Sequence, residues 1–350
     1  MSTDALAGPV TLADVARVAG VSLATASRVL HPGSRRPNEE LRVRVTQAAE
    51  DLQYAPNAHA QAVARGRTDV VGLVVHDISD PYFSSIAAGV LRAADEVNLI
   101  VTIADTRHDL GHEVRYVAAL RRQRAQAIIV AGSRSQDRRT TELLDRELTA
   151  FQREGGRVSM ISQHHLDVDT VLVENRAGAR ALALALHCRG YRTFAVLAGP
   201  ASQQTAFDRL SGFRAGLATR GVSVAREHVV RSEFTRDGGY AAMKTLLHAA
   251  NPLPTGSCVF AVNDLMAVGA MSALRDEGVD LPGDVAVAGF DDIETLRDVT
   301  PSLTTVRIPL EDLGAYALAL VSDTKPPAAR VMRITSEVVL RESTPPRKPC

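Results

Sequence analysis

The stretch VTLADVARVAGVSLATASRVL, residues 10 to 30, decides the fold of the N-terminal part of the chain. Thr11 stands three residues before Asp14 at the head of an apolar series, which predicts a helix that begins with a capping box. Gly20 predicts the end of that helix, and Ser22 predicts the cap of a second helix directly after it. Two helices joined by so short a turn cross steeply.

The second helix carries two different faces. One repeats apolar residues at the spacing that packs on the first helix, and the other carries Ala24, Thr25, Ser27 and Arg28. Short side chains allow close approach to a DNA major groove, hydroxyls bind phosphate oxygens, and an arginine fork matches guanine O6 and N7. The two helices alone leave a plain helical hairpin with a solvated polar face as an equal alternative.

The next residues predict a third helix and a short fourth one. Asn38 and two glutamates open an amphipathic run that continues to Leu52. Tyr54-Ala55-Pro56-Asn57 then leads into the alanine-rich run AHAQAVA, which Gly66 ends. An isolated helix of this length is marginal in water. We therefore expect a helical headpiece over residues 1 to 56 and a hinge helix with a linker over residues 57 to 69.

From Val70 short apolar runs alternate with amphipathic helices, which is typical of parallel sheets with crossover helices. Residues 70 to 341 exceed one comfortable hydrophobic core, so two lobes are expected, and residues 342 to 350 are assigned as a tail. Strands are expected at Val71–Val75, Leu99–Ile103, Ala127–Val130, Val158–Ile161, Thr193–Ala198, Cys258–Ala261 and Val285–Ala288. Helices are expected at Phe83–Val97, Gly178–Arg189, Ala206–Arg220, Arg236–His248 and Leu265–Glu277.

The composition is that of an ordinary globular protein, with 350 residues, 45% hydrophobic and 23% charged. The formal net charge is zero, so attraction to DNA must come from local placement of charge. The sequence has neither a signal-peptide pattern nor a membrane-length apolar stretch, which predicts a cytoplasmic protein. Cys188, Cys258 and Cys350 lack metal-ligand spacing and predict two core thiols and a terminal one, without a disulfide or a metal site.

Polar residues follow most of the predicted strands. Ligands of open parallel sheets bind beyond the carboxyl ends of the strands, so we expect a cleft there, which Arg209 also reaches. Arginine, aspartate and asparagine beside aromatic rings suit a small polyhydroxylated ligand. Neither a nucleophile motif nor a phosphate-binding glycine loop is found, so neither an enzyme nor a cofactor is expected. The strand ends carry His76-Asp77 with Tyr82-Phe83, Asp105, Ser133-Arg134, Ser162-Gln163, residues 199 to 205, Asn263-Asp264 and Asp291-Asp292.

These motifs resemble the LacI/GalR family of bacterial transcription regulators. The family's headpiece pattern V-T-L-x-D-V-A-x-x-A-G-V-S-x-x-T-x-S-R-V-L is matched from Val10 to Leu30, and Tyr54 to Asn57 looks like the start of its hinge helix. The resemblance implies an all-α helix-turn-helix headpiece and a two-lobed α/β effector domain, similar to periplasmic binding proteins, with doubly wound parallel sheets. Effector-domain motifs stand as LAGP at 197 to 200, RLSGF at 209 to 213, VNDLMAVGAM at 262 to 271, GFDD at 289 to 292 and PSLTTV at 301 to 306.

The resemblance also implies DNA-binding residues. Leu23, Ala24 and Arg28 take the base-reading positions, although Leu23 has equal claim to be a core residue. Val63 stands where the family pushes a leucine into the minor groove, and its shorter side chain predicts a weaker kink. Thr11 completes the DNA-binding set, and the phosphate contacts are Ser22, Thr25, Ser27, Tyr54 and Asn57.

By the same resemblance, Arg209, Asn263 and Asp291 bind the effector, and Phe83 and Phe234 stack on it. Helix capping is the alternative for Asp291, and a stronger one for Asp264. A surface ion pair is the alternative for Arg209. Ser162 stands where several members carry a ligand-facing aspartate, so the expected sugar has a nucleoside or purine as its alternative.

The resemblance implies a homodimer on double-stranded, palindromic operator DNA, and one short recognition helix is too little for selectivity by itself. No apolar heptads follow Leu340, which predicts a dimer rather than a tetramer. We expect a repressor controlled by a small-molecule effector, with an activator or dual regulator as the alternative. Ligand closure of the lobes is expected to separate and melt the paired hinge segments.

Overall fold

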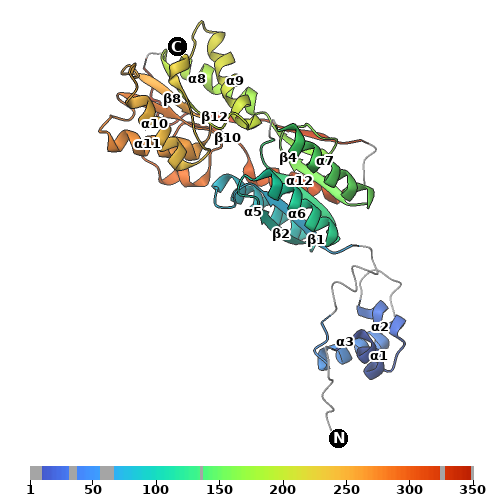
Figure 1. Cartoon of the computed structure of the whole chain (residues 1–350). Coiled ribbons are helices and arrows are strands. Elements are labelled where there is room, and N and C mark those ends of the chain that lie inside the picture. The colour runs from blue at the N-terminus through green and yellow to red at the C-terminus, as the bar shows by residue number, and fades with distance from the viewer. Residues whose placement is uncertain (1–9, 31–37, 56–66, 135–136, 324–327, 348–350) are drawn as a thin grey trace. The chain divides into compact units, whose positions relative to one another are not determined.

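The computed structural model describes residues 10–30, 38–55, 67–134, 137–323 and 328–347. The chain divides into two compact units, Met1–Thr68 and Asp69–Cys350. Figure 1 follows the chain through both units by colour. The expected hinge helix, with Asn57 and Val63, lies outside the described residues.

The first unit contains three helices in its described part, as predicted. They are α1 (Leu12–Ala19), α2 (Leu23–Leu30) and α3 (Glu39–Asp51). Thr11 and Asp14 form the expected capping box, and Gly20 ends α1 with a left-handed φ of 63°. A small apolar core, in which Val15, Ala26 and Val45 are completely buried, holds the three helices together.

The second unit contains two parallel sheets, which define its two lobes. The first lobe has the strand order β11-β5-β4-β3-β1-β2, and the second has β7-β6-β8-β9. The first sheet consists of β1 (Val70–Val75), β2 (Ile100–Asp105), β3 (Ala127–Ala131), β4 (Arg157–Ile161), β5 (Asp169–Val173) and β11 (Val331–Ile334). The second consists of β6 (Phe194–Ala198), β7 (Val229–Arg231), β8 (Ser257–Ala261) and β9 (Val285–Ala288).

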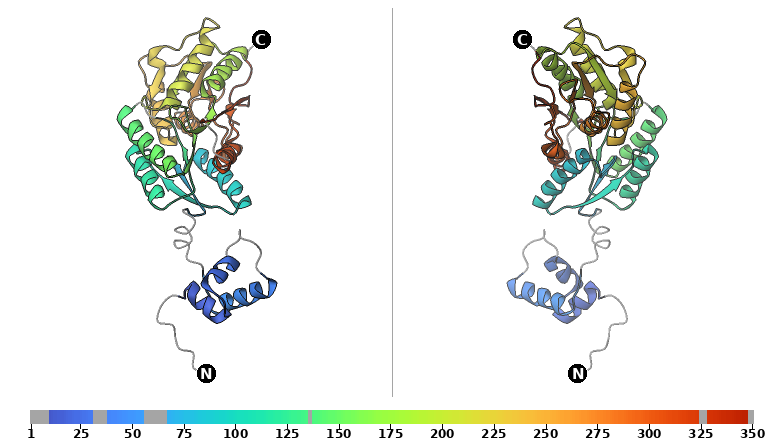
Figure 2. Two further views of the ribbon diagram at one scale, coloured as in Figure 1. Left: turned by 90° about the vertical axis from the view of Figure 1, so that its right-hand side faces the viewer. Right: turned by 90° about the vertical axis from the view of Figure 1, so that its left-hand side faces the viewer.

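Helices cover both faces of each sheet. In the first lobe, α5 and α12 pack on one face, and α6 and α7 pack on the other, as the two views of Figure 2 show. These helices are α5 (Pro81–Glu96), α6 (Leu110–Arg122), α7 (Arg138–Arg153) and α12 (Leu310–Ser322). The second lobe has α8 (Asn175–Cys188), α9 (Gln204–Ala218), α10 (Arg236–Leu247), α11 (Asp264–Asp276) and two short 3-10 helices, Arg226–His228 and Glu294–Asp298.

The chain passes between the lobes after β5, before α12 and after β11. At the crossings, β10 (Thr305–Arg307) pairs with β12 (Glu337–Val339) in an antiparallel ribbon. The segment assigned as a tail, residues 342 to 350, packs against the second lobe in its described part, where Ser343 and Thr344 are completely buried. The Ser343 hydroxyl donates to the Val287 carbonyl oxygen at 2.7 Å. The contact is made by hydroxyls, so the sequence offered no apolar signal for it.

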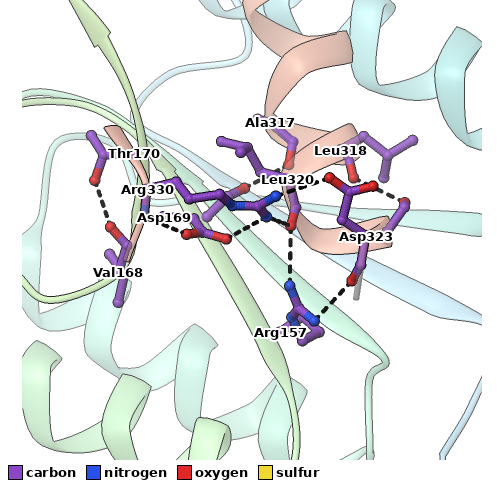
Figure 3. Close-up of polar contacts among 11 residues, drawn as sticks. Arg157, Val168, Asp169, Thr170, Ala317, Leu318, Leu320, Asp323 and Arg330 are labelled. Atoms are coloured by element: carbon purple, nitrogen blue, oxygen red, sulfur yellow. Dashed lines mark hydrogen bonds and ion pairs between the residues drawn. The ribbon is translucent and has the colours of Figure 1, made fainter. Parts of the chain in front are cut away.

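A cluster of arginine contacts fixes β11 at the edge of the first sheet. Figure 3 shows Arg330 between the end of α12 and β5. Its guanidinium donates to Asp169 Oδ2 at 2.8 Å, to the Leu320 carbonyl at 2.6 Å and to Asp323 Oδ2 at 2.9 Å. Arg157 donates to the Asp323 carbonyl at 2.8 Å. The edge strand is therefore anchored to the helix that precedes it.

All seven predicted strands are present, Val285–Ala288 with its predicted bounds and the others with bounds that differ by at most two residues. The strands β5, β7 and β10 to β12 were not predicted from the sequence, because they are only three to five residues long and each carries a charged residue. Cys258 is buried as expected, whereas Cys188 is exposed, so the prediction of two core thiols is wrong for Cys188. Among the described residues, no helix is both long enough and apolar enough to cross a membrane.

We expect Gly212→Ala to destabilise the second lobe, because α9 packs on α8 at this glycine. An added Cβ would lie 2.2 Å from the Arg176 carbonyl oxygen, and the backbone of α8 would have to move. Overpacking of this kind costs about 1 to 3 kcal/mol. Urea denaturation measures the loss. Gly111→Ala is the control, since its Cβ would meet only an exposed Asp109 oxygen, and an equal effect of the two changes would contradict the prediction.

Candidate functional sites: the recognition helix and the interlobe cleft

The outward face of α2 is exposed. Leu23 is 54% exposed, which decides against its alternative as a core residue. The Ser22 hydroxyl accepts a hydrogen bond from the Thr25 amide at 3.2 Å and lies 2.9 Å from the Thr25 hydroxyl. Arg28 Nε donates to the Ala24 carbonyl at 3.1 Å, which holds this side chain along the helix. The helix thus presents a short-chain polar surface with one guanidinium.

The other predicted DNA contacts are placed less uniformly. The exposed Thr11 hydroxyl lies 2.7 Å from Asp14 Oδ2, and two hydrogen bonds from Thr11 and one from Arg17 lower the pKa of Asp14 to about 2. Tyr54 is partly buried against the helical core. The structure therefore assigns a capping role to Thr11 and a packing role to Tyr54, in addition to any contact with DNA.

In the second unit, the five predicted effector residues line one cleft. This cleft is partly open to solvent, and both lobes contribute to its walls. Phe83 lies on the first-lobe wall. The second-lobe wall carries Arg209, Phe234, Asn263 and Asp291.

Arg209 is the centre of the cleft's polar network. Its Nε donates to Asn175 Oδ1 at 2.8 Å, and Nη1 donates to the Val262 carbonyl at 2.7 Å. Its Nη2 lies 2.7 Å from Asp291 Oδ1, and the guanidinium carbon stacks 4.0 Å from the centre of the Phe290 ring. Both side chains of the ion pair are at most 5% exposed. The surface-pair alternative for Arg209 is therefore wrong.

Asp291 sits in an unusual backbone and electrostatic setting. Its φ is 124°, in a region that residues other than glycine rarely occupy. Burial raises the pKa of the Asp291 carboxyl above its ordinary value, and the neighbouring Arg209 guanidinium opposes this shift by favouring the charged form. Oδ1 is close to Arg209 but accepts no well-aligned hydrogen bond.

The N-terminus of α11 is capped by a different residue from the two aspartates for which capping was the alternative role. Asn263 is the cap, because its Oδ1 accepts from the Met266 amide at 3.0 Å, while its Nδ2 donates to the Phe234 carbonyl at 3.3 Å. The capping alternative is therefore wrong for both Asp264 and Asp291. Asp264 is completely buried and instead accepts from the Thr305 hydroxyl at 2.6 Å and the Ile293 amide at 3.1 Å.

The aromatic walls of the cleft are set by close packing. The Phe234 ring covers Gly199, where an added Cβ would lie 2.6 Å from the ring. Phe83 is 6% exposed and packs edge-on against Tyr82, with ring centres 5.0 Å apart. Its partner on the other side is the His76 ring at 5.6 Å. Both phenylalanines are thus held in place at the cleft.

Not every polar strand end reaches the cleft. Arg134 turns away and makes a buried two-bond ion pair with Glu113, while its Nε donates to the Ser162 hydroxyl at 3.0 Å. The polar residues that line the cleft but were missed are Asp80, His108 and Asn175. Asn175 follows β5, so recognising that strand would have pointed to it. Among the described residues, no group of three or more histidine, cysteine or acidic side chains is placed to hold a metal ion.

Comparison with known proteins gives two matching family models. Residues 11–57 match the family described as bacterial regulatory proteins, lacI family, and residues 183–344 match a periplasmic binding protein-like domain. The chain is 33% identical over 342 residues to the HTH-type transcriptional regulator GalR of Escherichia coli (strain K12), covering 96% of each. It is 29% identical to the Ribose operon repressor of the same strain, covering 95% of this chain and 98% of that protein.

Solved structures agree in fold. A transcriptional regulator CelR-cellobiose complex is 29% identical, with a TM-score of 0.69 over 95% of this chain and 99% of that one. The Lac repressor dimer bound to operator and the anti-inducer ONPF is 24% identical, with a TM-score of 0.83 over 97% and 100%. At that identity the second likeness concerns the fold alone. The predicted fold class, a helix-turn-helix headpiece with a two-lobed α/β domain, is confirmed.

Asp264 predicts a defined dependence of stability on pH. Burial raises the pKa of its carboxyl to about 6, against the hydrogen bonds from Thr305 and Ile293. In the unfolded chain the pKa is about 3.9. The folded protein therefore holds the proton more tightly, and this stabilisation is complete below the unfolded pKa and is lost as the pH rises through 6.

Asp264→Asn removes this titration. We expect the free energy of unfolding of the parent, measured relative to the variant, to fall by about 2 kcal/mol from pH 4 to pH 7. Urea denaturation at several pH values measures both proteins, and titrations elsewhere in the chain largely cancel in the difference. A difference that stays constant over this range would contradict the burial effect.

Proposed function

The chain belongs to the lacI family of bacterial regulatory proteins, and we propose that it acts as a repressor. In this proposal, a homodimer of the chain binds a palindromic operator. The homodimer responds to a sugar that binds in the interlobe cleft. At the coarser level the chain is a DNA-binding transcription regulator and not an enzyme. The repressor activity, the dimer and the sugar are the proposed parts.

The observation that carries the sugar proposal is the composition of the cleft. Arg209 and Asp291 pair in its wall, which Asn263 and the Phe83 and Phe234 rings also line. Sugar hydroxyls both donate and accept, so they suit a guanidinium and a carboxyl together, while the C–H faces of the ring suit aromatic walls. The CelR complex with cellobiose supports the same class of ligand.

The observation that supports DNA reading is the exposed face of α2. Its terminal guanidinium nitrogens suit guanine O6 and N7, and its small residues allow the helix to approach the groove. One such helix contacts too few base pairs to select a site in a genome, so two copies related by a two-fold axis are expected to read a palindrome.

Control by the effector requires coupling between the cleft and the operator. Such couplings are typically about 1 to 3 kcal/mol and reciprocal, so operator DNA must change effector affinity by the same factor as the effector changes operator affinity. We propose that the dimer brings the two hinge segments, residues 57 to 64, together on the DNA. Lobe closure around a sugar then separates them and releases the operator.

Selection of bound sequences from a randomised DNA pool tests the DNA-reading part. The parent protein is expected to enrich one palindrome. Arg28→Ala is expected to lose discrimination at one base pair in each half-site, at a cost of about 1 to 3 kcal/mol, because a bidentate contact to guanine is removed. A loss of the same size on all DNA sequences would instead make Arg28 a phosphate contact, and failure of the parent to enrich a palindrome would overturn the dimeric operator.

Calorimetric titration of Asp291→Asn tests the effector-binding part, with D-galactose, D-ribose, cellobiose and adenosine as probes. We expect the variant to bind the sugar that binds the parent about tenfold more weakly or worse, because a bond to a charged group is lost. Operator affinity without sugar should be unchanged. Asp292→Asn is the matched control, since its carboxylate pairs with Arg307 and Arg341 outside the cleft. Binding of adenosine alone would overturn the sugar assignment.

A further inference from the structure

The first turn of α9 is capped by the opposite lobe. The first amide groups of a helix have no partner within the helix, and Gln203 at the cap position makes no side-chain hydrogen bond to them. Instead the Gln204 amide donates to the Arg134 carbonyl, and the Thr205 amide donates to the Ser133 hydroxyl, both at 3.0 Å. The helix belongs to the second lobe, whereas both acceptors follow β3 in the first.

A side-chain contact joins the same two lobes beside these bonds. Gln163, which follows β4 in the first lobe, donates through Nε2 to the Thr205 hydroxyl at 2.9 Å. Its Oε1 accepts from the Arg134 amide at 2.9 Å. We call the contacts of Ser133, Arg134 and Gln163 with the first turn of α9 the α9 cap. Three hydrogen bonds therefore cross between the lobes at one helix end.

The first-lobe side of the α9 cap is rigidly supported. The Arg134 guanidinium donates to both carboxylate oxygens of Glu113, at 3.0 and 2.7 Å, and both side chains are at most 4% exposed. Its Nε is held by Ser162. Since the side chain is fixed in this way, the carbonyl that caps Gln204 has little freedom to move. The cap is thus a preformed acceptor site rather than a flexible loop.

Arg209 lies one helical turn after Thr205 on the same helix. Its own bonds reach Asn175, Val262 and Asp291, which all belong to the second lobe. None of these bonds reaches the first lobe, so the α9 cap is a direct link between this helix and the first-lobe wall, beside the three segments that cross between the lobes. A ligand that touches both walls needs that relation to be correct.

We propose that Ser133, Arg134 and Gln163 are positioning residues of the effector site, which hold α9 so that Arg209 faces the first-lobe wall. The proposal rests on the proposed function in taking the cleft as the effector site. Loss of one cap bond is expected to weaken effector binding about fivefold, because the free energy that a helix cap typically contributes to stability corresponds to an affinity change of about this size. Every ligand that fills the cleft should lose the same factor, because the cap acts on the walls and not on a particular ligand group.

Gln204→Pro breaks one interlobe bond and spares the helix, because proline has no amide hydrogen and its Cδ would lie against the Arg134 carbonyl oxygen, which must then move away. Proline is accepted at the first helical position, and Gln203 has φ −93° and ψ 124°, which a following proline permits. Gln204→Ala is the comparator, because it loses the same side-chain bond to Asp208 but keeps the amide. Calorimetry on the full-length proteins with D-galactose, D-ribose and cellobiose should give affinities about fivefold weaker for the proline variant than for the alanine variant. Equal or tighter binding by the proline variant overturns the proposal.

Amide hydrogen exchange on the ligand-free protein keeps this proposal separate from the sugar assignment. If none of the three sugars binds the parent, the sugar assignment fails. The exchange rates of the Gln204 and Thr205 amides then still show whether the hydrogen bonds of the α9 cap are present. We expect the Gln204 and Thr205 amides to be protected, Ser133→Ala to speed exchange at Thr205 about fivefold, and Ser133→Thr to restore protection. Ser211→Ala, which loses a hydroxyl bonded within α9 itself, should leave both amides protected. Exchange of the parent amides at the rate of a free helix end overturns the proposal.

Discussion

The buried pair between Arg209 and Asp291 is the interaction on which the cleft depends. It draws together α9, the loop after β9, the end of β8 through the Val262 carbonyl, and the start of α8 through Asn175. Removing one member of a buried pair typically costs about 3 to 5 kcal/mol, because an uncompensated charge stays behind. The position of α9 in the second lobe is therefore set by electrostatics as well as by the close packing at Gly212.

The same pair connects the cleft to the segments that cross between the lobes. Asp291 and Asp292 both have positive φ, at 124° and 59°, which is unfavourable for residues other than glycine. The Asp291 amide donates to Val306 at 2.8 Å, and the next carboxylate pairs with Arg307 and Arg341. The Asp291 side chain therefore lines the cleft, while the adjacent Asp292 side chain forms ion pairs with Arg307 of β10 and with Arg341. The backbone of Asp291 is therefore joined directly to β10.

Local sequence patterns were sufficient to predict the helices of the headpiece and the buried strands of the two sheets. Thr11 with Asp14 and Ser22 with Thr25 satisfy helix ends within three residues, so the sequence alone exposes them. Continuous apolar runs such as Ala127–Ala131 indicate buried parallel strands. The short segment β11, which contains Arg333, becomes a strand because it pairs with β5 and because the neighbouring Arg330 binds Asp169. These contacts come from distant parts of the chain, so the local sequence pattern does not reveal them.

The candidate site was predicted in the same uneven way. Its five residues were found because motifs and strand ends mark them, and the structure brings them into one cleft. Arg134 was expected there as well, but its partner Glu113 lies 21 residues away on α6, and only the fold brings them together. The same pair explains why position 162 can carry a serine. Glu113 already neutralises the charge of Arg134, so a hydroxyl group is sufficient to accept the remaining hydrogen bond from Arg134 Nε. Burial lowers the pKa of His76 to about 4, so this wall adds a neutral imidazole beside hydroxyl and amide groups, together with the acidic Asp80. The proposed sugar, as an uncharged ligand, suits such a wall better than a phosphate ester would, because an anion would meet carboxyl groups without a new cation to balance it.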